Sequence, residues 1–169
     1  MAQNKVFLIS DLHLGHENIL RFDRPDGTKL RPNFRDLHHM HAVICENWCR
    51  VVSPQDKVYV LGDVAFKKDA LELMRGWPGH KRLVRGNHDL FTTNTYFGIF
   101  EEIYGVRQLD GYWLTHVPMH PESLSGRAKA NIHGHLHANK LVDKRYVNVS
   151  VECIDYTPVD FEDIKKRFE

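Results

Sequence analysis

Histidine and acidic side chains gather in a few short stretches of this sequence, at spacings that suit metal binding. Twelve of the 169 residues are histidine, and most of them lie within residues 11–16, 38–41 and 133–137. Histidine is the side chain that most often ligates metals, and its pKa lies near neutrality. The excess therefore points to a metal site rather than to an ordinary distribution of surface residues.

The candidate ligands share a position directly after a predicted strand. Val6–Ile9 is a continuous apolar run with the length of a buried strand, and shorter apolar stretches predict further strands at 57–61, 80–84 and 130–133. The polar groups that follow such runs, or end the hairpin strand at 112–115, are Asp11, His13, Asp63, Asn87, His116, His135 and His137. Because α/β proteins build sites where strands end, we expect these groups to share one rim.

Two of these groups are pairs with a spacing of two residues. In an extended chain, Asp11 and His13 would point to the same side, and so would His135 and His137. Seven oxygen and imidazole groups exceed the ligands that one ion with an open position requires. They fit two ions, provided that one carboxylate bridges them.

The first half of the chain has the alternation of an α/β protein. Apolar residues recur at spacings of three and four from Asn33 to Val51, which predicts a helix, and Asn33 with Asp36 resembles a capping box. A shorter helix is predicted over Lys67–Arg75. Strands that alternate with helices favour a sheet with parallel pairing.

The second half is predicted to be more antiparallel. Asp110-Gly111 lies between two strand-like runs and indicates a hairpin. Arg145–Glu152 alternates as a half-exposed strand does, and Pro158 is expected at the first position of a terminal helix that runs to Phe168. We find no repeat or linker and expect one domain over residues 1–169.

Five ordered motifs resemble those of the calcineurin-like metallophosphoesterases. They are Asp11-x-His13, Gly62-Asp63, Gly86-Asn87-His88-Asp89, His116, and Gly134-His135-x-His137. The resemblance runs from residue 11 to residue 137, and the short chain is similar to small stand-alone phosphoesterases of bacteria and their viruses. It implies a four-layer α/β/β/α sandwich of two mixed sheets with the metals at one edge.

The resemblance also implies a role for each motif residue. One metal would be bound by Asp11, His13 and His137, the other by Asn87, His116 and His135, with Asp63 bridging. Two such ions clamp a phosphoryl group while a metal-bridging water attacks phosphorus in line. The oxygen and nitrogen ligands suit manganese, with iron or zinc as alternatives. His88 would be the catalytic group that stabilises the transition state or protonates the leaving oxygen.

The sequence departs from the phosphoprotein phosphatases of that superfamily at the second and third motifs. Those enzymes have an aspartate that orients the histidine and an arginine that binds phosphate, where this chain has Phe66 and Lys67, and a glutamate where it has Asp89. We therefore expect a small phosphodiester or nucleotide-type substrate rather than a phosphoprotein. The orienting partner of His88 stays open.

Composition narrows the class of protein further. A net charge of +1 gives no global attraction to nucleic acid or membrane, and no apolar stretch approaches the span of a bilayer. Three cysteines without framework spacing favour a reducing, cytoplasmic location. Alternatives are a phosphomonoesterase on nucleotides or phosphorylated ends, and a non-catalytic metal-binding scaffold. Nucleic-acid binding rests on Lys81–Arg85 and Lys165–Arg167 alone, and the oligomeric state stays open.

Several other side chains keep two interpretations. His16 either contacts substrate or binds backbone at a helix start, whereas His133 is expected to pack in the interior. His41, Cys45 and Cys49 share a helix face, but a fourth zinc ligand is not evident. Lys81, Arg82 and Arg85 are candidates for a basic lip, and Arg127 or Lys129 for a phosphate contact.

Overall fold

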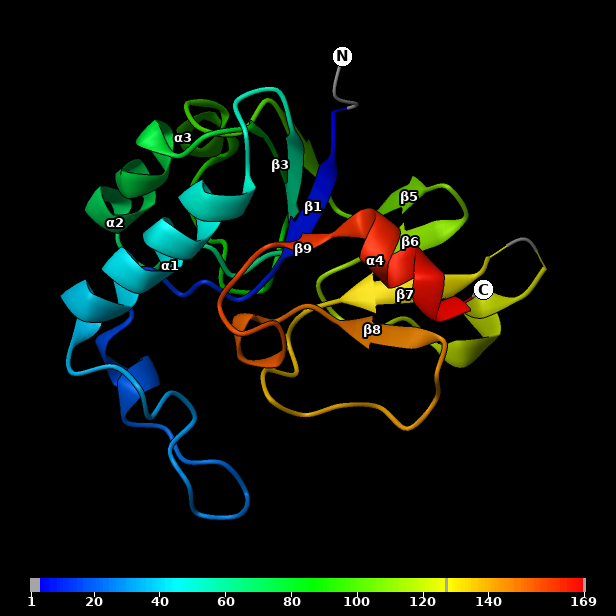
Figure 1. The fold of residues 1–169 in the computed structure, drawn as a ribbon, viewed down its shortest axis with the longest axis horizontal. Helices are drawn as coiled ribbons and strands as arrows, with labels where there is room; N and C mark the ends of the chain where they lie inside the picture. The colour runs from blue at the N-terminus through cyan, green and yellow to red at the C-terminus, as the bar shows by residue number, and fades with distance from the viewer. Residues whose placement is uncertain (1–3, 127, 169) are drawn as a thin grey trace.

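The computed structural model describes residues 4–126 and 128–168, which form two sheets with helices packed against them (Figure 1). The α-helices are α1 (Leu37–Val51), α2 (Lys68–Glu72), α3 (Thr93–Phe97) and α4 (Phe161–Lys165). The 3-10 helices are η1 (Glu17–Leu20), η2 (Leu73–Gly76), η3 (Pro121–Leu124), η4 (Val151–Cys153) and η5 (Lys166–Phe168). The strands are β1 (Val6–Ile9), β2 (Lys57–Val60), β3 (His80–Val84), β4 (Glu102–Tyr104), β5 (Arg107–Leu109), β6 (Tyr112–Leu114), β7 (Ala130–His133), β8 (Tyr146–Asn148) and β9 (Val159–Asp160).

The first sheet has the strand order β4-β3-β2-β1-β9. Strands β1 to β4 are parallel, in a register that pairs Val6 with Lys57 and Lys57 with His80. Strand β9 closes the edge and runs antiparallel to β1. The crossover helices α1 and α2 lie between successive strands, as the alternation of the first half predicts.

The second sheet has the order β5-β6-β7-β8 and corrects one expectation. The hairpin of β5 and β6 is antiparallel as predicted, but β6, β7 and β8 are parallel to one another. The expectation of a more antiparallel second half therefore holds for the hairpin and for β9, which pairs antiparallel with β1, but not for β7 and β8. The long loops between these strands return the chain to the same end, and that is the connection parallel pairing requires.

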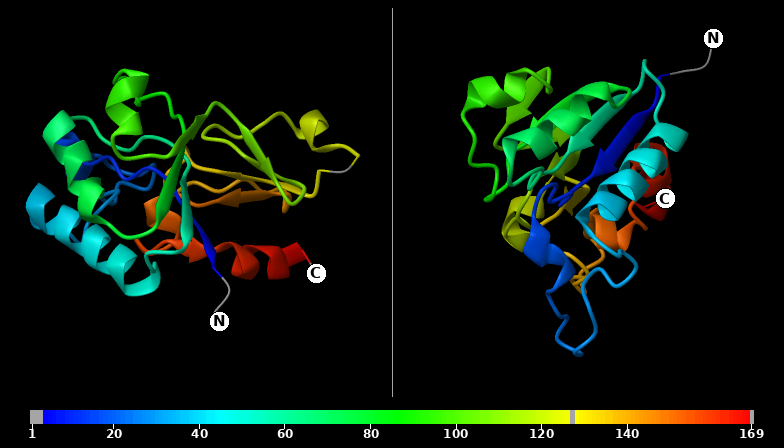
Figure 2. Two further views of the ribbon diagram at one scale, coloured as in Figure 1. Left: turned by 90° about the horizontal axis from the view of Figure 1, so that it is seen from above. Right: turned by 90° about the vertical axis from the view of Figure 1, so that its left-hand side faces the viewer.

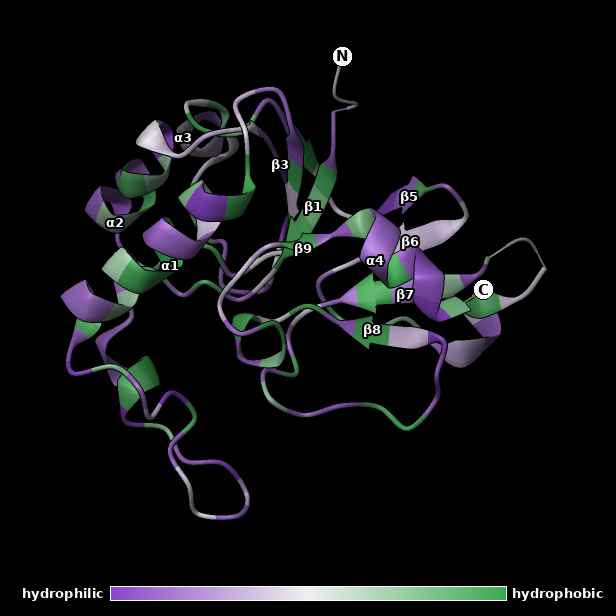
Figure 3. Cartoon of the chain, in the orientation of Figure 1, coloured by the Kyte–Doolittle hydropathy of each residue, from purple (hydrophilic) through white to green (hydrophobic). Residues whose placement is uncertain are grey.

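Figure 2 shows the layers from two further sides, and two apolar cores lie between them. One face of β1 contributes Phe7 and Ile9 to the core under the helices, together with Trp48 of α1. The other face contributes Leu8 to the core between the two sheets, where Phe161 of α4 also packs. Figure 3 shows apolar strands in the interior and polar outer surfaces on the helices. The α/β fold of two mixed sheets with helices is as predicted.

Two helix starts differ from the predictions. Helix α1 begins at Leu37, because the side chain of Asp36 accepts the His39 N–H at 2.7 Å and caps it, so the capping box at Asn33 was wrong. The terminal helix begins at Phe161 rather than at Pro158. Backbone pairing with β1 draws Val159–Asp160 into the sheet, and Asp160 then caps α4.

The strand predicted over Arg145–Glu152 is shorter than its alternation suggested. Pairing in β8 ends at Asn148, and Val151–Cys153 forms a 3-10 turn. Ser150 belongs to the polar side of this alternation, yet it is fully buried because it joins the first sheet through a bridge to Ser10. Among the described residues, no helix is long and apolar enough to cross a membrane.

Replacement of Trp48 tests the core under the helices. Its side chain is fully buried, its indole N–H donates to the Pro78 carbonyl at 2.9 Å, and its ring lies 5.2 Å from that of Trp77. We expect Trp48→Ala to lower the free energy of unfolding by about 3–5 kcal/mol in urea denaturation. Glu46→Ala, on the exposed face of the same helix, should change it by less than about 0.5 kcal/mol.

Candidate metal centre

The loops that follow β1, β2, β3, β6 and β7 meet where the two sheets join. Ser10 makes the junction: its N–H donates to the Val149 carbonyl at 2.9 Å, and its carbonyl accepts the Val151 N–H at 3.0 Å. The seven predicted ligands come together at this junction and form one continuous cluster of side chains. The loops after β1, β2 and β3 supply four of them, and the loops after β6 and β7 supply three.

Left-handed backbone, rather than extended chain, aims most of these side chains. Positive φ angles occur at Asp11 (59°), His13 (51°), Asp63 (53°), His135 (69°) and His137 (49°). Residues with a Cβ rarely adopt this conformation, and it costs free energy that the surrounding structure must supply. The expectation that each pair converges because its chain is extended was therefore wrong, although the pairs do converge.

Two motif glycines allow these loops to pack against one another. A Cβ at Gly86 would collide with the Asp63 side chain, and a Cβ at Gly134 would collide with Ser10 and Asp11. The glycines of the Gly86-Asn87 and Gly134-His135 motifs are thus required by close approach of loop to carboxylate. Larger residues would push the proposed ligands apart.

Asp11, His13 and His137 form the first group of potential ligands. One donor atom from each lies within 4.8 Å of the others. Asp11 Oδ2 accepts hydrogen bonds from Ser150 Oγ and from the His135 N–H, each at 2.9 Å. Its Oδ1 and both ring nitrogens of His13 are buried without a hydrogen-bond partner among the described residues. Such orphaned acceptors are costly unless a cation binds them.

Asp63 lies between this group and a second one. Its Oδ2 is 3.6 Å from His13 Nε2 and 3.4 Å from His116 Nε2. On the far side, the Asn87 carbonyl oxygen is 2.9 Å from His116 Nε2 and 3.0 Å from His135 Nδ1. The backbone carbonyl of Leu61, 2.8 Å from His116 Nδ1, holds that ring with Nε2 toward the centre.

The electrostatics of the cluster favour ionised carboxylates. Burial raises the pKa of Asp11, but the His13 imidazole, whose Nε2 lies 3.7 Å from Asp11 Oδ1, and the nearby His116 outweigh burial, and the pKa lies below its ordinary value. The pKa of Asp63 is lowered in the same way, against burial, chiefly by His116. Two ionised carboxylates among imidazoles, without a thiolate, are the ligand set of a divalent transition metal. The residues present therefore fit such an ion.

His88 lies on the rim of the cluster and is exposed. Its backbone N–H donates to Asp63 Oδ1 at 2.8 Å. Its ring centroid is 5.0 Å from that of Phe66 and 6.0 Å from that of His13, and no side chain in the described part of the chain hydrogen-bonds to the imidazole. The orienting partner that the sequence left open is thus the Phe66 ring rather than a carboxylate. Lys67 forms an ion pair with Glu17 at 2.8 Å.

Asp89 fixes the loop that carries Asn87 and His88. Its carboxylate accepts the N–H groups of Gly86 at 2.7 Å and of Asp63 and Val64 at 2.9 Å each. The carboxylate therefore joins the loop after β3 to the loop after β2, and it is almost completely buried. Both of its oxygens are occupied by these N–H groups, and Asp89 stays outside the proposed ligand set.

Arg31 and Glu152 hold the group of Asp11, His13 and His137 in place, and neither was identified from the sequence. Arg31 Nε lies 2.8 Å from Glu152 Oε1, and the guanidinium also donates to the carbonyls of Asp11 and Leu12. The same Oε1 lies 3.1 Å from His137 Nδ1, which leaves Nε2 of that ring for a metal. Burial raises the pKa of Glu152, but Arg31 and His137 hold it below its ordinary value. Because Arg31 and Glu152 are 121 residues apart, no local sequence pattern indicates that they pair.

The other singled-out residues have structural roles. His41 Nε2 accepts the Gly15 N–H at 3.0 Å, so it supports the loop after β1 rather than a zinc ion. Lys81 donates to the Trp77 carbonyl, Arg82 pairs with Glu102, and Arg85 donates to the carbonyls of Asp89 and Phe91, so the proposed basic lip does not form. His133 is buried as expected. Arg127 lies outside the described residues.

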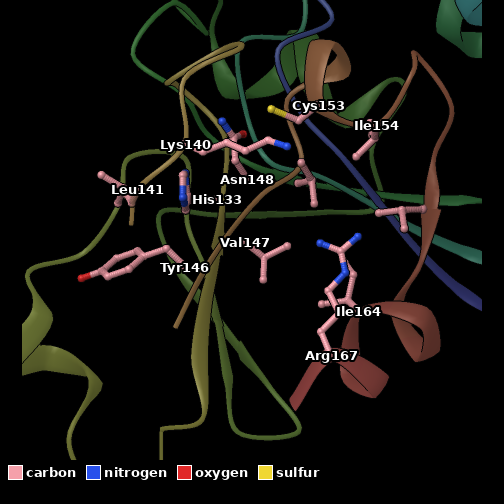
Figure 4. Close-up of a pocket in the computed structure, with 12 residues that line it drawn as sticks. His133, Lys140, Leu141, Tyr146, Val147, Asn148, Cys153, Ile154, Ile164 and Arg167 are labelled. Carbon is pink, nitrogen blue, oxygen red and sulfur yellow. The ribbon is translucent and has the colours of Figure 1, made fainter. Parts of the chain in front are cut away.

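A separate hollow of about 160 Å³ lies beside β8 and η4 and is lined by His133, Asn148 and Cys153 among others (Figure 4). Lys140 and Arg167 line it together with aliphatic side chains. Asn148 and Cys153 donate to the His137 carbonyl at 2.8 Å and 3.1 Å. None of the seven proposed ligands lines this hollow, so it is separate from the metal centre. The two hydrogen bonds to the His137 carbonyl hold the loop that carries this histidine.

Comparisons with known proteins place the chain in a family. It is 34% identical over 183 aligned positions to the uncharacterized protein MJ1445 of Methanocaldococcus jannaschii, covering 100% of this chain and 94% of that protein. The chain belongs to the same family as this archaeal protein. No family model matches the sequence.

Viral and structural relatives extend the comparison. The Gene 66 proteins of Mycobacterium phages L5 and D29 are 31% and 35% identical over 91 residues, which is 51% of this chain and 40% and 41% of theirs. The crystal structure of AQ665, a protein of unknown function from Aquifex aeolicus, matches with a TM-score of 0.74 and 29% identity. That match covers 97% of this chain and 99% of AQ665, so the fold is shared along its whole length.

Replacement of Glu152 tests the support beneath the centre. Glu152→Gln leaves the buried Arg31 without its counter-charge, so we expect the free energy of unfolding to fall by about 3 kcal/mol. Metal affinity, measured by calorimetry, should weaken by about 10- to 100-fold because His137 loses its charged partner. Glu72→Gln, which breaks the exposed pair with Arg75, should change neither quantity appreciably. Equal effects of the two variants would contradict this role for Glu152.

Proposed function

We propose that this protein is a divalent-metal-dependent phosphoesterase of the calcineurin-like type, with a small phosphodiester or nucleotide-type substrate. The position of Asp63 carries the proposal. Its Oδ2 lies between His13 Nε2 and His116 Nε2, at 3.6 Å and 3.4 Å, and each imidazole belongs to a different group of ligands. A carboxylate between two sets of metal-binding groups is the arrangement that a two-ion centre needs.

The proposal assigns two ions to the seven ligands. One ion would be bound by Asp11, His13 and His137, and these residues lie together in the structure. The other would be bound by Asn87, His116 and His135, with Asp63 bridging. The hydrogen-bond distances from Asn87 Oδ1 to both imidazoles support this second set. Manganese suits the mixed oxygen and nitrogen ligands, with iron and zinc as alternatives.

When bound, such ions polarise a phosphoryl group and activate water for attack on phosphorus. The oxygen of the water bonds to phosphorus and the water loses a proton to solvent, while the bond from phosphorus to the leaving oxygen breaks. The leaving oxygen takes a proton from His88, which lies exposed beside Asp63. Asp89 holds the His88 loop in place during this step through its three backbone hydrogen bonds.

Substrate choice tests the proposed reaction. With added manganese, we expect hydrolysis of bis(p-nitrophenyl) phosphate with a higher kcat/KM than that of p-nitrophenyl phosphate, and loss of both activities in EDTA. The release of nitrophenol gives both rates in one assay. Preference for the monoester would favour the phosphomonoesterase alternative. Failure on both esters by a protein that binds manganese would favour the metal-binding scaffold.

Two substitutions separate metal binding from proton transfer. Asp63→Asn should reduce the bound manganese and abolish activity, because the proposed bridging charge is lost. His88→Asn should keep the manganese content of the wild type but lower kcat by about 10²- to 10⁴-fold. Metal analysis of both purified variants, alongside kinetics, provides the comparison. Wild-type kcat in the His88 variant would remove that residue from the chemistry.

A further inference from the structure

A hollow of about 390 Å³ lies beside the metal centre, between the loops that follow β1 and β2. It is lined by Gly15, His16, Glu17, Asn18, Phe66 and Lys67. The proposed ligand set uses none of these residues. The volume is in the range of small-molecule sites, and the hollow opens to solvent beside His13 and His88.

The walls of this hollow are held by backbone pairing. The Leu14 N–H donates to the Val64 carbonyl at 2.9 Å, and the Phe66 N–H donates to the Leu14 carbonyl at 2.8 Å. The two loops thus continue the parallel pairing of β1 and β2 beyond the strands. The Gly15 N–H donates in turn to His41 of α1. His16 and Phe66 are consequently carried on ordered backbone.

Aromatic side chains line this hollow and lie at its edge. The His16 ring meets the Phe66 ring edge-on at a centroid distance of 4.1 Å and the Phe22 ring at 5.6 Å. Phe66 remains 36% exposed and Phe22 48% exposed. Two exposed phenylalanines that both contact His16, one of them lining the hollow, offer a stacking surface for a planar ring.

The position of Phe66 relates this surface to the reaction. Its ring centroid is 5.0 Å from that of His88 and 5.4 Å from that of His13. The two imidazoles are only 6.0 Å apart, so they do not enclose the phenyl ring between them. His88 is the proposed proton donor to the leaving oxygen. Whatever is attached to that oxygen therefore lies beside Phe66.

We propose that this hollow is a leaving-group subsite for phosphoesters that carry a planar aromatic ring, the chemistry shared by aryl and nucleoside esters. The proposal rests on the proposed phosphoesterase function and names its substrate class. The Lys67 and Glu17 ion pair, at 2.8 Å, closes the outer wall and offers polar groups to substituents of the ring. Phe66 is thus a specificity-determining residue that binds substrate by its flat face.

Replacing Phe66 with leucine shows whether its ring stacks on the substrate or only packs over the His13 imidazole. Leucine keeps apolar bulk over that imidazole but lacks a flat face, whereas tryptophan keeps the face. We expect the manganese-loaded wild type to bind phenylphosphonate five- to tenfold more tightly than methylphosphonate in calorimetry. Phe66→Leu should remove this preference with unchanged manganese content, and Phe66→Trp should retain it. An adenosine 5′-phosphonate in the same titration separates nucleoside from aryl ligands.

Phe97→Leu is the matched control, because Phe97 is a 54% exposed phenylalanine on α3. It should leave the preference intact. Equal affinity of the wild type for both phosphonates, or loss of manganese from Phe66→Leu, would overturn the subsite. A protein that hydrolyses phosphoesters without this preference keeps its proposed function and loses the subsite. A protein that prefers phenylphosphonate but hydrolyses no phosphoester keeps the subsite and loses the proposed function.

Discussion

The structure depends on buried carboxylates that accept backbone N–H groups from neighbouring loops. Asp11 accepts the N–H of His135, Asp63 accepts that of His88, and Asp89 accepts those of Asp63 and Val64. Each bond crosses from one strand-end loop to another, so each acid fixes a loop other than its own. Because hydrogen bonds to ionised acceptors are the strong ones, these contacts can hold backbone at φ values that it would otherwise avoid.

Two of these carboxylates place negative charge in the interior, and that charge must be neutralised. Asp11 and Asp63 are buried close together, and the nearest fully buried cation, Arg31, is used by Glu152 and by backbone carbonyls. Buried charges are stable only when they are paired or bind metals. The fold thus positions negative charge and unpartnered imidazole nitrogens in one place and leaves their neutralisation to ligands from outside. This is the physical basis on which a divalent centre is the best explanation of the cluster.

Much of this organisation could be predicted from the sequence because it depends on short stretches of neighbouring residues. Strands β3 and β7 begin and end where the strand predictions at 80–84 and 130–133 place them. The direction of β7 and β8 could not be predicted, because it depends on how loops cross the second sheet. Left-handed φ at Asp11 or His137 has no local signature either, since hydrogen bonds from distant residues impose it. The role of Glu152 depends on Arg31, 121 residues away.

Phe66 stands where the phosphoprotein phosphatases have an aspartate. In the proposed function, this difference affects both the orientation of His88 and the surface that meets the substrate. A carboxylate at this position would orient His88 and favour its protonated form, whereas a phenyl ring can only pack against it. His88 therefore takes its position from the backbone bond to Asp63 and from the ring contact with Phe66. In the proposed reaction, the apolar surface of Phe66 beside the leaving group takes the place of a carboxylate that would orient His88. Substrates whose leaving group is both planar and readily expelled, such as phenols, need little protonation and would lose least by this exchange.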